Sequence, residues 1–474
     1  MKCFLVTLLC GSLAVGQWRA PQVKPEALAA HVSFLASDAL EGRRTPSKGL
    51  DAAAAYIASW FRRNRLEAPV DGGYFQIAKI NVRRQPADGF SLVLEDGGAK
   101  VNVPASAISG SLGKAASVDG AGIYKLEMND ANAGADLTEQ DIAGRALLLV
   151  PKAGVRSFGL LRKVLGWKLP AILMVDGSPF AEGFGAVRLG QRQAGLLRLH
   201  SKEAADFAAR LPAGATSAKL TLRAAAPVDE QAEARNVIGI VRGSDPQLRE
   251  SYVMVSAHYD HLGSAASGTG DPVFHGANDD ASGVAAMLEI AAAAAKRKPK
   301  RSLLFVAFYG EEDGLVGSRY YGRNPVVPLE RMAAQLNLEQ LGRTDVDGEK
   351  EIAAYNLTGF DFTTLHSSLE KSAKRYKVRL YKKEGSDAFF GRSDNQAMAD
   401  VGVPSTTVSI GYEFPNYHQR SDTWDKLDYP NMARIAGSLA AGVLSIAKDR
   451  QPPMWNDANE QGKKYKAIRN TGQK

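Results

Sequence analysis

Residues 252–258 read Tyr-Val-Met-Val-Ser-Ala-His, an apolar run that ends at a histidine. Three more apolar runs lead into polar residues: 302–309 before Glu311 and Glu312, 332–338 before Glu339, and 404–410 before Tyr417 and His418. The alanine-rich residues 281–295 between the first two runs predict a helix. Strands that alternate with helices predict a layered α/β domain, in which sites form beyond the carboxyl ends of the strands.

The rest of the 474-residue chain divides by the spacing of its apolar residues. Helical spacing over residues 27–40 and 50–66 predicts two amphipathic helices, and short apolar runs between glycines and aspartates over residues 89–223 indicate a β-rich segment. Residues 227–235 are interpreted as a charged linker. The expected order is a signal peptide (1–16), an N-terminal helical part of the catalytic domain (17–88), a β-rich domain (89–226), the α/β domain (227–450) and a solvated basic polar tail (451–474).

The first residues predict export from the cytoplasm. Met1 and Lys2 precede an apolar stretch, and small residues up to Gly16 suit a cleavage site. The stretch is shorter than the roughly 20 residues of a membrane-spanning helix, so a cleaved signal peptide is expected rather than a stable membrane anchor. The location would be secreted or periplasmic. Cys3 and Cys10, the two cysteines of the chain, would leave with the signal peptide, which excludes disulfides and thiolate ligands.

The chain carries 59 Lys and Arg against 51 Asp and Glu, a net charge of +8. Part of this excess lies in the tail, and part lies in residues 296–301, where cations at a helix end complement the helix dipole. No aromatic residues are interleaved with the cations of residues 296–301, so we expect no nucleic-acid partner. Nothing in the sequence indicates the oligomeric state.

The polar ends of the predicted strands combine imidazole and carboxylate groups. Carboxylates gathered at one sheet edge repel each other unless a cation lies among them. Histidine and carboxylate ligands suit zinc or a similar ion, and more than four ligands suggest two ions that share a carboxylate and a hydroxide. The sequence therefore predicts metal-assisted hydrolysis. It has no Gly-x-Ser-x-Gly, His-Glu-x-x-His or phosphate-loop motif to support another mechanism.

Five motifs of the α/β part keep a fixed order and spacing. They are His258-Tyr-Asp260, Gly276-Ala-Asn-Asp279-Asp280-Ala-Ser-Gly283, Gly310-Glu311-Glu312-Asp-Gly-Leu-Val-Gly-Ser318, Asn337-Leu-Glu339 and Tyr417-His418-Gln-Arg-Ser-Asp422-Thr423. In this order they resemble the M28 family of zinc aminopeptidases. Leu35 to Arg43 extends the resemblance, and Asp141 to Val150 is similar to a protease-associated domain. The resemblance implies a three-layer α/β/α exopeptidase domain with a mixed central sheet and an inserted β-rich protease-associated domain.

The resemblance also implies a set of metal ligands. Asp279 would bridge two zinc ions per chain. Glu312 and His418 would complete one coordination sphere, and His258 and Glu339 the other. The familiar members have Asp at the position of Glu339, so the second site could differ in metal affinity or preference.

Three further residues would act in catalysis. Glu311 would be the general base that activates a metal-bridging water, and Asp260 would orient the imidazole of His258. Tyr417 would donate a hydrogen bond to the tetrahedral oxyanion. Family members also imply a cis peptide between Asp279 and Asp280. His261, beside the first motif, is expected at the surface or in a supporting position.

We therefore expect an aminopeptidase that removes N-terminal residues from peptides with a free N-terminus. Alternatives are an M28-type carboxypeptidase, which needs a basic pocket, and a glutaminyl cyclase-like enzyme, which the full two-metal ligand set disfavours. A non-catalytic binding homologue is the third alternative, and the retention of Glu311 and Glu312 argues against it.

Overall fold

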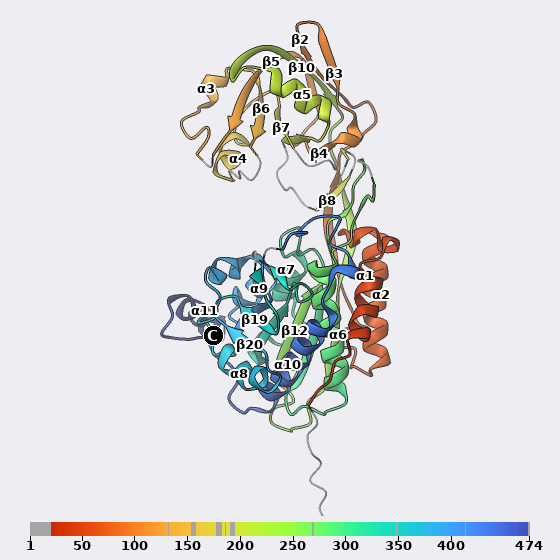
Figure 1. Ribbon diagram of the computed structural model, residues 1–474, viewed down its shortest axis with the longest axis vertical. Coiled ribbons are helices and arrows are strands. Elements are labelled where there is room, and N and C mark those ends of the chain that lie inside the picture. The colour runs from red at the N-terminus through yellow and green to blue at the C-terminus, as the bar shows by residue number, and fades with distance from the viewer. Residues whose placement is uncertain are drawn as a thin grey trace, which may run out of the picture.

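The structure is a computed structural model that describes residues 20–472 except 131, 153–157, 177–182, 185, 190–194, 268–269, 347–348 and 413. The predicted signal peptide and both cysteines lie outside the described residues. A nine-stranded and an eight-stranded sheet organise the described part of the chain (Figure 1). None of the helices described is both long and apolar enough to cross a membrane.

The nine-stranded sheet is mixed and has the order β20-β19-β21-β16-β12-β15-β11-β1-β8. Its strands are β1 Phe75–Arg84, β8 Val187–Leu189, β11 Val228–Val241, β12 Tyr252–His258, β15 Ser302–Phe308, β16 Met332–Leu338, β19 Ala354–Leu357, β20 Arg379–Tyr381 and β21 Ser405–Ser409. Strand β12 pairs in parallel with β15 and β16, whereas β11 pairs antiparallel with β15 and β1. Every residue of β12, β15 and β16 is buried, which is why these strands are continuous apolar runs in the sequence.

Helices cover both faces of this sheet and make the predicted three-layer α/β/α domain. One face packs against α1 Pro25–Leu35, α2 Lys48–Arg63, α6 Ser282–Ala295, α8 Leu365–Arg375 and α10 Tyr429–Lys448. The other face packs against α7 Val316–Arg323 and α9 Asn395–Ala399. The helices predicted over residues 27–40, 50–66 and 281–295 are α1, α2 and α6. Helix α1 ends at Leu35 because the chain turns there into a short 3-10 helix, Asp38–Arg43.

The eight-stranded sheet is a separate layer at the other end of the molecule (Figure 1). It comprises β2 Ser91–Asp96, β3 Ala99–Asn102, β4 Ile108–Ser111, β5 Ala116–Met128, β6 Ala146–Pro151, β7 Ile172–Val175, β9 Leu196–Leu199 and β10 Gly214–Ala224. The helices beside it are α3 Glu139–Ile142, α4 Phe158–Val164 and α5 Lys202–Arg210. The short β8 lies between two stretches of this layer in sequence but pairs with β1 of the other sheet. Two small ribbons, β13 Gly263–Ser264 with β14 Val273–Phe274 and β17 Asp345–Val346 with β18 Glu349–Lys350, complete the strands.

Two segments differ from the sequence-based expectation. Residues 227–235, interpreted as a linker, belong mostly to β11, which pairs with β1 from Arg84 opposite Val228 to Phe75 opposite Val237. The tail predicted to be solvated contains helix α11, Glu460–Gly472, and buries Trp455 and Tyr465 against Phe390 and other aromatic residues. In both cases a polar segment has regular structure because of specific contacts: strand pairing with β1 in the first, and packing of two aromatic side chains in the second.

Candidate metal centre

The candidate metal centre forms where the predicted strands end. His258 is the last residue of β12, Glu311 and Glu312 follow β15, and Glu339 follows β16. Asp279 lies in the turn Ala277–Ala281 that opens helix α6, and the peptide between Asp279 and Asp280 is cis, as the resemblance implied. The parallel pairing of β12 with both neighbours brings these ends to one edge of the sheet.

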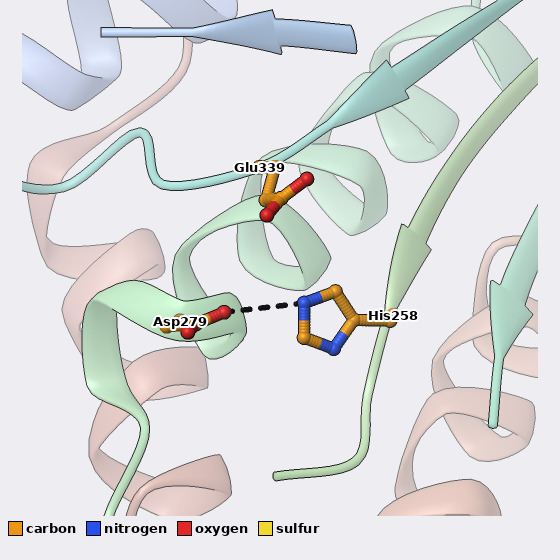
Figure 2. Close-up of side chains that lie close together, drawn as sticks. All are labelled: His258, Asp279 and Glu339. Atoms are coloured by element: carbon orange, nitrogen blue, oxygen red, sulfur yellow. Dashed lines mark ion pairs between the residues drawn. The ribbon is translucent and has the colours of Figure 1, made fainter. Parts of the chain in front are cut away.

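Asp279 lies at the centre of the cluster. One of its oxygens, Oδ1, is 3.2 Å from Nε2 of His258, and the other, Oδ2, is 3.1 Å from Nε2 of His418. The ligand atoms of His258, Asp279 and Glu339 all lie within 4.8 Å of one another. Figure 2 shows these three side chains converging from β12, from the turn before α6 and from the end of β16.

A second group of donor atoms lies on the other side of Asp279. Oε2 of Glu312 is 3.2 Å from Nε2 of His418, and Oε1 of Glu312 is 2.8 Å from Nδ1 of His261. The ligand atoms of His261, Asp279 and Glu312 also lie within 4.8 Å of one another. Asp279 therefore belongs to both groups, which is the arrangement that a bridging carboxylate needs.

The polar atoms of these groups fit a bound cation. Among the described residues, neither ring nitrogen of the fully buried His258 makes a hydrogen bond of good geometry, and the same is true of Nε2 of His418. Several carboxylates and imidazoles are thus buried together with too few hydrogen bonds to satisfy them. Zinc is the ion that this set of nitrogen and oxygen donors suits.

Asp260 and Asp422 support the cluster from outside. Oδ1 of Asp260 accepts a hydrogen bond from the backbone N–H of Glu311 at 3.1 Å and lies 3.6 Å from Nδ1 of His258. The carboxylate of Asp422 accepts hydrogen bonds from the backbone N–H groups of Asn278 and Asp279. These contacts fix the positions of the donor groups rather than adding ligands.

The electrostatics of the cluster differ between the two adjacent glutamates. Burial, reinforced by Glu339 and Glu312, raises the pKa of Glu311 well above its ordinary value. Burial acts on Glu312 in the same direction, but the neighbouring His418 and His261 together outweigh it and lower the pKa of Glu312 to about 2. Glu312 is therefore the permanently charged member of the pair, whereas Glu311 can exchange a proton.

The structure brings the predicted residues into one region. Asp279, Glu311, Glu312, Glu339, Tyr417 and His418 line a single cavity, and His258 and Asp260 are buried beside it. The ring of Tyr417 stacks on that of His418 at 3.9 Å between centroids. His261 was not predicted to be a ligand. It directly follows Asp260 of the first motif, and this position was the one sequence signal for an imidazole close to Glu312.

Together, the three-layer fold and the two groups of donor atoms that share Asp279 define an α/β protein with a candidate metal centre. Comparison with known families then identifies its group: residues 236–443 match the model of peptidase family M28. The part of the chain that carries the candidate metal centre is therefore similar to this family.

Two of the similar curated proteins are aminopeptidases by name. The chain is 29% identical over 275 residues to the Mycobacterium tuberculosis protein "Probable lipoprotein aminopeptidase LpqL", covering 52% of this chain and 51% of that protein. It is 26% identical over 225 residues to aminopeptidase YwaD of Bacillus subtilis, covering 46% of each. The chain thus spans about half the length of these relatives.

Solved structures share the fold. The zinc aminopeptidase BSAP from Bacillus subtilis aligns with a TM-score of 0.64 and 19% identity, covering 90% of this chain and 95% of that one. An aminopeptidase from Aneurinibacillus sp. strain AM-1 aligns with a TM-score of 0.59 and 18% identity, covering 89% and 93%. These likenesses extend over both sheets of the molecule.

Proposed function

We propose that this protein is a secreted or periplasmic aminopeptidase that binds two zinc ions and removes N-terminal residues from peptides. The observation that carries the proposal is the position of Asp279, which contacts donor groups on both sides. The names of the related proteins agree with this activity. The layer of residues 91–224 would be the protease-associated domain, and the signal peptide would direct export.

The proposed ligands follow from the two groups around Asp279. His258 and Glu339 would hold one zinc ion, and Glu312 and His418 the other, with Asp279 shared between them. His261 would hold Oε1 of Glu312 in position through its 2.8 Å contact. When bound, zinc supplies positive charge that polarises the scissile carbonyl and lowers the pKa of water.

The protein's own residues would handle the protons. Glu311 lines the cavity, and burial raises its pKa, so its carboxylate is suited to accept a proton from water and later release it to the leaving amine. Asp260 would fix the backbone of Glu311 and the ring of His258 together. Tyr417 would donate its hydroxyl proton in a hydrogen bond to the developing oxyanion, because burial and nearby carboxylates raise its pKa and keep it protonated.

The activity can be tested with aminoacyl p-nitroanilides and the same compounds acetylated at the N-terminus. We expect hydrolysis of the free substrates only, loss of activity with a chelator and recovery with zinc. Activity that persists after the metal has been removed would contradict the metal mechanism. Cleavage restricted to N-blocked peptides with a free C-terminus would instead identify a carboxypeptidase.

The division of labour between the two glutamates gives a second test. Glu311→Gln should lower kcat by about 10²- to 10⁴-fold, because it removes the proton acceptor, while the zinc content stays near two per chain. Glu312→Gln is the matched variant, and it should lower both kcat and the zinc content. Elemental analysis and initial rates on the same samples distinguish the two. Loss of zinc from Glu311→Gln with its retention in Glu312→Gln would show that the roles are reversed.

A further inference from the structure

The cavity at the metal centre continues beyond the proposed ligands. Its volume is about 420 Å³. Its lining also includes Arg319 from helix α7 and Arg392 from the end of the 3-10 helix Ser386–Arg392. Aromatic residues Phe389 and Tyr412 line the same region. The cavity therefore combines the acidic residues of the metal centre with two cations.

Arg392 is held by a stack of rings. Its guanidinium carbon lies 5.0 Å from the centroid of the Phe389 ring, which in turn stacks on Tyr412 at 4.3 Å with an angle of 11° between the rings. The hydroxyl of Tyr412 donates a hydrogen bond to the buried Asn356, and the amide of Asn356 donates to the backbone of Ser409 at 3.0 Å. The stack thus connects the exposed cation to the central sheet, so that little side-chain entropy is lost when Arg392 binds an anion.

Neither arginine forms an ion pair within the part of the chain that the structure describes. Within the described ranges, no Asp or Glu oxygen lies within 4.0 Å of the guanidinium nitrogens of Arg319 or Arg392. The four carboxylates that line the cavity, Asp279, Glu311, Glu312 and Glu339, are matched in charge by the two zinc ions of the proposed function. The two arginine charges are then left without a counterion until a substrate enters.

We propose that Arg392, with Arg319, binds a carboxylate of the substrate, so that the preferred substrates are peptides that carry this group close to the scissile bond. The inference rests on the proposed peptidase function. The carboxylate can come from an acidic side chain at the first position or from the C-terminus of a very short peptide. A guanidinium presents paired N–H donors to either source, so the chemistry of recognition is the same.

Matched substrates test the proposal and distinguish the two sources. The first pair is glutamyl and glutaminyl p-nitroanilide, and the second is the dipeptide Leu-Gly and its C-terminal amide. With the zinc-loaded protein we expect one of the two pairs to show a preference: kcat/KM should be about tenfold higher for its substrate with the carboxylate than for its amide counterpart. A tenfold preference is of the size that charge-assisted hydrogen bonds give. Arg392→Gln should remove most of that ratio, and Arg319→Gln should reduce it. Arg323→Gln is the control, since Arg323 is an exposed arginine on the same helix outside the cavity, and it should leave the ratio unchanged.

Leucyl p-nitroanilide and a binding measurement separate this inference from the proposed function. If leucyl p-nitroanilide is cleaved while both pairs give ratios near one, or if neither arginine variant changes the ratio, the carboxylate site is wrong and the aminopeptidase assignment stands. If no free N-terminus is cleaved with zinc present, the proposed function is wrong. Calorimetric titration of the zinc-loaded Glu311→Gln protein with glutamate and with glutamine then tests the carboxylate site alone. The site is supported if glutamate binds more tightly than glutamine and if this difference is lost in the double variant Glu311→Gln, Arg392→Gln. Equal binding of the two amino acids overturns it.

Discussion

At the scale of single residues, the two adjacent glutamates after β15 are directed to different partners. The backbone of Glu311 is held by Asp260, whereas the side chain of Glu312 contacts His261 and His418. The two glutamates lie in the bend and turn that follow β15, and their different partners allow one to serve as a ligand while its neighbour stays available for proton transfer. The difference in their pKa directions follows from these partners.

Arg43 is another residue on which the centre depends, although it touches none of the proposed ligands' side chains. It is buried and donates from Nε to the carbonyl of Tyr259 at 2.9 Å and from its Nη atoms to the carbonyls of His275 and Gly276 at 2.8 and 3.0 Å. It also donates to the carbonyl of Leu35. One guanidinium thus joins the loop after His258 to the loop before Asp279.

We expect Arg43→Ala to destabilise the protein by about 3 kcal/mol or more, because several buried carbonyls lose their donor. Zinc affinity should fall as well, since His258 and Asp279, two of the proposed ligands, adjoin these loops. Urea denaturation and zinc titration measure both effects. Arg434→Ala, on the exposed side of helix α10, is the matched control and should change neither. A fully stable Arg43→Ala protein with normal zinc affinity would show that the loops hold their positions without this residue.

At the scale of elements, the structure shows which segments can be read from a sequence. Strands β12, β15 and β16 were predicted because both of their faces are buried, which demands apolar residues at every position. The first half of β11 was missed because most of its residues are exposed, and backbone pairing with β1 holds it instead. Backbone hydrogen bonds impose no choice of side chain, so the polar residues there resemble a linker.

The candidate site was also predictable only in part, because only some of its residues lie in local sequence motifs. The residues from His258 to His418 lie in short motifs after strands, and these motifs carried the resemblance to the family. The contact of His261 with Glu312 depends on how the loop after β12 turns, and the stack under Arg392 joins segments that no motif connects. Contacts of this kind are set by tertiary packing, which the sequence pattern does not encode locally.

The C-terminal segment offers a test at this scale. Trp455 is 4% exposed, stacks on Tyr465 of helix α11 at 4.9 Å, and donates from Nε1 to the carbonyl of Gly402 at 2.9 Å. We expect Trp455→Ala to lower the free energy of unfolding by about 3–5 kcal/mol, the usual range for removing a buried large aromatic side chain. The neighbouring Met454 is 62% exposed, so Met454→Ala should have little effect in the same denaturation experiment. Equal stability of both variants would mean that this segment does not contribute to folding.

The same aromatic cluster links the C-terminal segment to the cavity. Tyr465 contacts Phe390 at 5.7 Å between ring centroids, and Phe390 follows Phe389 in the 3-10 helix that carries Arg392. A segment predicted to be solvated therefore packs behind the wall of the cavity. Loss of this packing in Trp455→Ala should accordingly raise KM more than it lowers kcat.

At the scale of the whole molecule, the net charge of +8 conceals a strong local excess of acid. Removing zinc leaves buried carboxylates close to each other, and burial raises the pKa of Asp394 from 3.8 to about 7. His418 changes in the same direction: burial opposes its charged form, but Glu312 and Asp279 outweigh burial and raise its pKa from 6.5 to about 10. Both groups bind protons more tightly in the folded state than in the unfolded chain.

This difference determines how the zinc-free protein should respond to pH. A group with a raised folded pKa stabilises the fold fully below its unfolded pKa, and that contribution is lost as the pH rises through the folded value. For Asp394 the loss runs from about pH 4 to about pH 7, and for His418 from about pH 6.5 to about pH 10. Each group contributes at most about 1.4 kcal/mol per pH unit within its window. The chelated protein should therefore become less stable between pH 5 and pH 9.

Zinc should reverse this trend, because it neutralises the carboxylates and competes with protons for the same imidazole nitrogens. At a free zinc concentration 100 times its Kd, binding should add about 2.7 kcal/mol for each independent site. Thermal denaturation of chelated and zinc-loaded samples at each pH measures the difference, which should widen as the pH rises. Asp394→Asn is the internal control and should flatten the profile of the chelated protein below pH 7, since an amide does not titrate. Parallel profiles with and without zinc would contradict a metal centre built on these groups.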